Sequence, residues 1–262
     1  MADGKVIFAG PSFAGLGAAD DRSVTVLPPC RQGDIYLATL DSPSVIGIVD
    51  GYFEGQPSVW HKEILWALSC GIHVVGSASM GALRAAETDS FGMKGIGAIY
   101  QWYRDGTIED DDEVALLHGP GELNYPTLSL AMVNVRATLA DAEQRKIISG
   151  ATSAVLFDQA KAQFYKVRNW PGVVDATRIA VPAMAEELDA FGDWVADNAV
   201  DQKSIDARAL LDFVTGDDFA EPFQPAFEFE LTEFWHRCTR KWEKSAREPV
   251  EPPGDDGYRL FG

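Results

Sequence analysis

Short apolar runs alternate with helix-like patterns between residues 5 and 118 of the chain. Apolar runs bounded by glycine, proline or aspartate indicate buried strands, and apolar positions that recur at helical spacing indicate the helices between them. This alternation is typical of βαβ units and predicts a mainly parallel sheet with covering helices. The predicted strands are residues 5–9, 23–27, 45–50, 72–77 and, with a weaker pattern, 114–118; the predicted helices are 34–40, 57–70 and one that begins near Gly81.

The pattern changes at about residue 127, where long helical repeats begin. They predict helices at 128–148, 153–167, 181–196, 204–214 and 227–246. The predicted fold class is therefore α/β, a mainly parallel sheet with covering helices in the N-terminal half, followed by a largely helical C-terminal half. We expect an α/β core over residues 1–125, a helical region packed on that core over 126–248, and a flexible tail over 249–262, which holds three prolines and three glycines.

The net charge of the chain argues against polyanionic binding partners. Lys and Arg number 22 and Asp and Glu 40, so the net charge is −18, and neither half is basic. A chain of this charge is not expected to bind nucleic acid or an anionic membrane. One basic cluster falls within 227–246 and predicts either a solvated helix face or a docking patch for an acidic protein: Arg237, Arg240, Lys241, Lys244 and Arg247.

Cysteines and acidic residues give no sign of a metal or cofactor. The three cysteines are widely spaced and form no C-x-x-C pair, which favours reduced thiols in the cytoplasm over a zinc site. The chain begins without a signal-peptide pattern and has no run of 18 apolar residues. Five consecutive acids at 109–113 are expected to splay into water rather than surround a cation. We therefore expect a soluble, cytoplasmic protein without a metal.

The strand at 72–77 continues directly into a small-residue turn that holds Ser77 and Ser79, and then into a helix. This is the context of a nucleophile elbow, in which a tight turn presents a serine hydroxyl beside helix amides. The pattern around Ser79 is S-x-S-x-G instead of G-x-S-x-G. Two interpretations stay open at this point, because Ser79 can act as a nucleophile or its hydroxyl can cap the helix.

Lys62 is the predicted general base, since none of the four histidines has an obvious Ser-His-Asp arrangement. The helix that carries Lys62 begins at the carboxyl edge of the sheet, where the strand before Ser79 also ends. An amine in an apolar cleft has a lowered pKa and can deprotonate serine. The alternative is a solvated lysine paired with an acid. Asp50, which ends the third strand, is expected either to orient Lys62 or to form a turn with Gly51.

Several runs of residues resemble the TfuA-like family: 48–54, 59–68, 76–87, 91–93, 110–115, 118–120 and 131–139. The resemblance covers roughly residues 5–140. Proteins of this family act beside YcaO enzymes in backbone thioamidation, in which sulfur replaces a peptide amide oxygen on a ribosomal peptide or on methyl-coenzyme M reductase. The resemblance implies a hydrolase that releases sulfide from the thiocarboxylated C-terminus of a ThiS-like carrier and helps the YcaO partner engage its precursor peptide.

The family resemblance also implies a Ser-Lys catalytic pair, and the matching positions are Ser79 and Lys62. Amides of the turn at Met80 and Gly81 are expected to hold the oxyanion, with Ser77 as a competing hydroxyl or supporting donor and Asp50 in support. Contacts to the substrate tail are expected from Pro11, Ser12, His61 and Arg84. Two alternatives stay open: a non-catalytic binding module that docks the YcaO partner, and a small-molecule hydrolase that uses the same turn.

Overall fold

A computed structural model describes residues 4–16, 23–53, 55–216 and 219–247 of the chain. The described residues include a five-stranded sheet made of β1 (Lys5–Phe8), β2 (Val24–Leu27), β3 (Val45–Ile48), β4 (His73–Ser77) and β5 (Lys94–Ile96). The strands lie in the order β2-β1-β3-β4-β5, and every neighbouring pair is parallel. The predicted α/β class with a helical C-terminal half is confirmed.

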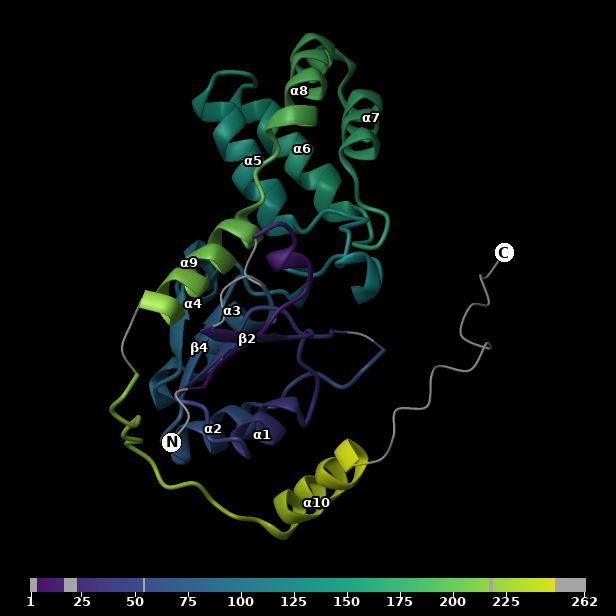
Figure 1. The fold of residues 1–262 in the computed structure, drawn as a ribbon. Helices are drawn as coiled ribbons and strands as arrows, with labels where there is room; N and C mark the ends of the chain where they lie inside the picture. The colour runs from purple at the N-terminus through teal and green to yellow at the C-terminus, as the bar shows by residue number, and fades with distance from the viewer. Residues whose placement is uncertain (1–3, 17–22, 54, 217–218, 248–262) are drawn as a thin grey trace, which may run out of the picture. The chain divides into compact units, whose positions relative to one another are not determined.

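Alternate residues of the central strands point to opposite faces of the sheet, and different helices cover the two faces. Phe8, Ile46, Ile48 and Val74 pack in one apolar cluster, to which α1 (Asp34–Thr39), α2 (His61–Ser69) and α3 (Met80–Thr88) contribute. Ile7, Val45 and Val75 pack in a second cluster with α9 (Gln202–Gly216). A helix from the C-terminal half thus covers the face opposite α1, α2 and α3, as Figure 1 shows.

Four further helices of the C-terminal half form a bundle with its own apolar cluster (Figure 1). They are α5 (Met132–Gln144), α6 (Gly150–Ala162), α7 (Trp170–Ala180) and α8 (Ala185–Asn198). The sequence pattern did not predict α7 or the short α4 (Ala98–Arg104). Among the described residues no helix is long and apolar enough to cross a membrane.

Two predicted elements differ from the structure. Residues 114–118 form no strand; they run as a loop in which His118 makes an isolated β-bridge to Thr127, and the fifth strand is the short β5. The helix expected from residue 57 begins only at His61, with Trp60 at its N-cap, because the N–H of Trp60 donates to the Glu63 carboxylate of the first turn at 3.1 Å.

The chain divides into two compact units, residues 1–228 and a second unit that begins at Phe229. The second unit contains α10 (Glu233–Arg247), which carries the predicted basic cluster. Within this unit the ring of Trp235 contacts those of Phe229 and Trp242. The predicted tail at 249–262 lies outside the described residues.

Candidate functional site

The turn between β4 and α3 holds Ser79 in a strained and uncapped position. The Ser79 N–H donates to the Ser77 carbonyl at 2.8 Å, and Ala78 between them has a φ of 64°. A three-residue turn with positive φ at its centre is rare and costly for a residue with a Cβ atom. Ser79 is the N-cap residue of α3, yet its hydroxyl makes no capping hydrogen bond. The structure therefore excludes helix capping as the role of this hydroxyl.

Gly81 allows the start of α3 to approach the sheet closely. A Cβ atom at this position would collide with the backbone carbonyl of Ile48, and the Gly81 N–H donates to the Val49 carbonyl at 3.2 Å. Because this amide already has an acceptor, it is less suited to hold an oxyanion than an amide without one. The Met80 N–H has no acceptor among the described residues. Gly51 packs directly against the side chain of Met80.

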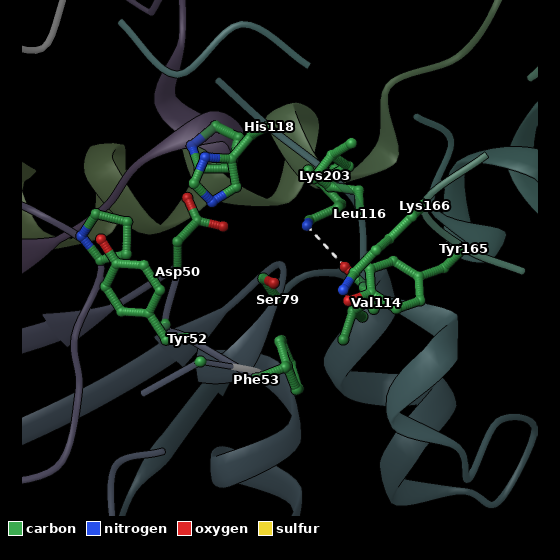
Figure 2. Close-up of a pocket in the computed structure, with 16 residues that line it drawn as sticks. Asp50, Tyr52, Phe53, Ser79, Val114, Leu116, His118, Tyr165, Lys166 and Lys203 are labelled. Atoms are coloured by element: carbon green, nitrogen blue, oxygen red, sulfur yellow. Dashed lines mark hydrogen bonds between the residues drawn. The ribbon is translucent and has the colours of Figure 1, made fainter. Parts of the chain in front are cut away.

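A cavity of about 410 Å³ opens at the carboxyl edge of the sheet. Loops that follow the first four strands contribute Pro11, Pro29, Asp50 and Ser79 to its wall. In this strand order the edge beside β1 and β3 is the point at which the chain reverses direction across the sheet, where open α/β sheets bind their ligands. Figure 2 shows Ser79 between the side chains of Asp50 and Lys203. The far wall comes from residues 114–118, Tyr165, Lys166 and Lys203.

Asp50 shapes the first loop of the cavity. One of its carboxylate oxygens accepts the N–H groups of Gly10 and Ser12, at 2.8 and 3.0 Å, and the other accepts the Ser12 hydroxyl at 2.7 Å. The side chain is buried although it lines the cavity. It is therefore a fixed negative charge whose position is set by three hydrogen bonds.

Lys203 lies at the start of α9 and is a cavity residue that the sequence analysis missed. It is buried, and its Nζ donates to the Val114 carbonyl at 2.8 Å (Figure 2). Burial lowers the pKa of the amine, and the charges of Asp50 and Asp201 offset only part of that effect. No local signal could identify it, since a lysine at a helix start ordinarily faces solvent.

The other predicted site residues divide into two groups. Pro11 lines the cavity, and the Ser12 hydroxyl donates to the carboxylate of Asp50, which also lines it. Lys62 is the second residue of α2, half-buried, and is not among the described residues that line the cavity. His61 and Arg84 meet at the Glu87 carboxylate, at 2.8 and 2.6 Å, and they too are not in the cavity lining.

Ser77 serves the packing of the sheet against α9. It is fully buried, and its hydroxyl donates to the Asp206 carbonyl at 2.7 Å. Its hydroxyl is therefore occupied away from the cavity, and the structure does not support its prediction as a competing hydroxyl.

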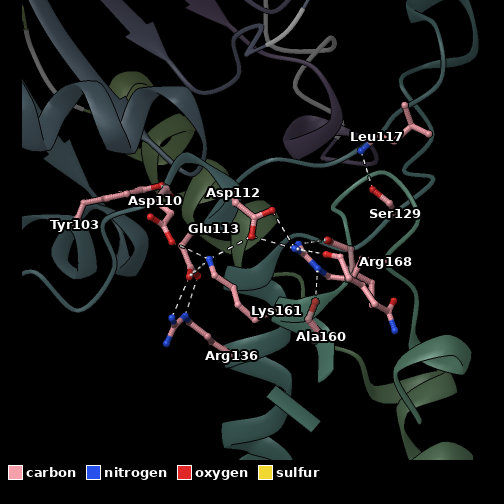
Figure 3. A network of polar contacts seen from close by, with 12 residues as sticks. Tyr103, Asp110, Asp112, Glu113, Leu117, Ser129, Arg136, Ala160, Lys161 and Arg168 are labelled. Atoms are coloured by element: carbon pink, nitrogen blue, oxygen red, sulfur yellow. Dashed lines mark hydrogen bonds and ion pairs between the residues drawn. The ribbon is translucent and has the colours of Figure 1, made fainter. Parts of the chain in front are cut away.

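An ion-pair network fixes the far wall of the cavity (Figure 3). Glu113 accepts hydrogen bonds from Arg136 and Lys161, and Asp112 accepts from Lys161 and Arg168. The expectation that the acidic run at 109–113 is solvated is wrong for these two carboxylates. Their partners belong to the helical half of the chain, so the network ties the N-terminal end of residues 114–118 to that half.

These features define an α/β protein whose strained serine opens into a cavity at the carboxyl edge of a parallel sheet, a class of site suited to nucleophilic chemistry. Residues 50–169 match the family model described as TfuA-like protein, which supports a TfuA-like assignment for this part of the chain and an involvement in YcaO-associated thioamidation. The match includes Asp50, Ser79 and residues 114–118, whereas Lys203 lies beyond it. No curated protein matches the chain.

Proposed function

We propose that this protein is a serine-type hydrolase that releases sulfide from the thiocarboxylated C-terminus of a ThiS-like sulfur carrier. The sulfide would supply a YcaO-type enzyme for backbone thioamidation, and the protein would assist that enzyme in engaging its peptide substrate. The observation that carries the proposal is the placement of the Ser79 hydroxyl. It makes no capping hydrogen bond, it lies at a strained turn, and it faces a cavity at the sheet edge.

The cavity has room for the terminal acyl group of a peptide tail. Its volume of about 410 Å³ accommodates only a few residues of a narrow peptide tail. Attack by Ser79 on the thiocarboxylate carbon places negative charge on the carbonyl oxygen. The Met80 N–H, which has no acceptor among the described residues, and the adjacent Gly51 backbone are the proposed donors to that oxygen.

The test is sulfide release from a thiocarboxylated ThiS-type carrier by the purified protein. Ser79→Ala should lower the rate by at least about a thousandfold, because the nucleophile is lost. Ser77→Ala should retain release, since this hydroxyl donates to the Asp206 carbonyl away from the cavity. Thermal unfolding of each variant checks that it is folded.

Absence of release by the folded wild-type protein, even with its YcaO partner present, would contradict the hydrolase. If Ser79→Ala also left thioamidation intact in the assembled system, the protein would be a binding module for the YcaO enzyme.

A further inference from the structure

We infer that Lys203, and not Lys62, is the general base that takes the proton from Ser79. This inference rests on the proposed hydrolase function and names a residue outside the family match. Its starting point is placement: Lys203 and Ser79 line one cavity, which Lys62 does not line.

The fold brings Lys203 to Ser79 from the opposite face of the sheet. The helix α9 packs on β3, β4 and β5 through Leu210 and Val214 and begins at the carboxyl edge, where β4 ends. Lys203 is its second residue, and the Lys203 N–H is held by the Asn134 side chain at 3.1 Å. Because Ser77 is also tied to α9 through the Asp206 carbonyl, the Ser79 turn and the start of α9 are positioned together.

The hydrogen bonding of Lys203 suits a neutral amine. Within the described residues its Nζ donates to a single acceptor, the Val114 carbonyl. A buried ammonium needs acceptors for three N–H groups, whereas a neutral amine has two donors and a lone pair that accepts a proton. The lone pair is the feature that a general base requires.

The surroundings of the amine lower its pKa on balance, which makes the neutral form more accessible. Burial is the largest effect, and the positive end of the α9 helix dipole acts in the same direction. The negative charges of Asp50 and Asp201 raise the pKa of the amine and so act against burial. The other titratable groups that line the cavity are Lys166, His118, Tyr52 and Tyr165. Asp50 then stabilises the ammonium that forms once the proton is taken.

In the proposed reaction Lys203 and Ser79 both return to their starting protonation states. Nζ accepts the Ser79 proton as Oγ bonds to the thiocarboxylate carbon, and the ammonium then donates it to sulfur as the C–S bond breaks. The products are the acyl-serine and hydrosulfide. A water molecule next gives a proton to Nζ as its oxygen attacks the ester, and the ammonium returns that proton to Oγ as the C–O bond breaks. The freed acid ionises to carboxylate and releases one proton to solvent.

The experiment compares Lys203→Met and Lys62→Met in the sulfide-release assay, with Lys94→Met on β5 as a control outside the site. Lys203→Met should lower kcat by at least about a hundredfold, the usual contribution of a general base, with unchanged carrier binding. The acid limb of the kcat/KM profile should disappear with it. In Lys203→Ala, added methylamine should restore part of the activity, more strongly as pH rises, because the neutral amine is the active species.

A second measurement does not depend on the carrier. Labelling of Ser79 by a fluorophosphonate reports activation of the serine itself, and Lys203→Met should slow it by a similar factor. Labelling that is independent of Lys203, or loss of activity in Lys62→Met with full activity in Lys203→Met, would overturn the inference. Labelling that depends on Lys203 without any sulfide release would reject the proposed substrate and keep the pair.

Discussion

Asp50 shows how one buried carboxylate supports the site at the scale of a single residue. Two of its three hydrogen bonds come from backbone N–H groups, so the side chain fixes the loop after β1 as well as placing a charge in the cavity. The two roles can be separated. An asparagine keeps one oxygen for the N–H groups of Gly10 and Ser12, and its amide nitrogen can donate to the Ser12 hydroxyl, which is also an acceptor.

The Asp50→Asn variant should therefore remain folded and shift the pH dependence of hydrolysis. The negative charge of Asp50 raises the pKa of Lys203, so its removal lowers that pKa further and exposes the free amine at lower pH. The acid limb of kcat/KM should move to lower pH, while the unfolding free energy changes by less than about 1 kcal/mol. A pH profile of sulfide release checks this, and an unmoved or raised acid limb would exclude an electrostatic link between the two residues.

At the scale of elements, the contact between α3 and the sheet depends on Gly81. Gly81→Ala places a methyl group against the Ile48 backbone, which cannot move aside as a side chain does. We expect a loss of about 3 kcal/mol or more in the unfolding free energy, together with displacement of the Ser79 turn. Gly192→Ala in α8 is the matched control: its Cβ meets nothing within 4 Å, and alanine should stabilise the helix by up to about 1 kcal/mol. Urea unfolding measures the change in unfolding free energy of both variants. Equal changes in the two variants would mean that α3 does not approach the sheet so closely.

The sequence predicted correctly those elements whose burial produces a run of apolar residues. Runs such as 45–50 and 72–77 are apolar because both faces of a central strand are covered, and the structure confirms them as β3 and β4. The strand β5 contains only Lys94–Ile96 and includes a glycine, so it leaves no such run. Residues 114–117 are apolar for a different reason, because they line a cavity, and Val114 and Leu116 join the core without pairing in the sheet.

Only those site residues that directly follow a predicted strand in sequence could be predicted. Ser79 and Asp50 each follow a strand, and parallel strands bring their carboxyl ends to one edge. The same reasoning placed Lys62 near that edge, but it could not tell which way the side chain points. Lys203 is separated from Ser79 in sequence by the whole helical bundle, and it lines the same cavity only because α9 returns to cover the sheet.

At the scale of the whole molecule, residues 1–228 contain apolar clusters on the two faces of the sheet and a third cluster in the α5–α8 bundle. Glu113 joins the loop at the cavity wall to that bundle through Arg136 on α5 and Lys161 on α6. Burial would raise the pKa of Glu113, but the hydrogen bonds from Arg136 and Lys161 outweigh it and hold the pKa below the usual value.

A carboxyl group whose pKa is lower in the folded state stabilises the fold above the unfolded pKa, here near 4.5, and this contribution disappears as pH falls through the folded value. Glu113→Gln should therefore reduce the unfolding free energy by about 2 kcal/mol at pH 7, and the difference from the wild type should shrink below pH 4.5. Denaturant unfolding at a series of pH values measures this difference. Glu109→Gln is the control from the same acidic run, because Glu109 is exposed and should change little. A deficit in Glu113→Gln that stayed constant with pH would mean that the bundle is held to the cavity wall by packing alone.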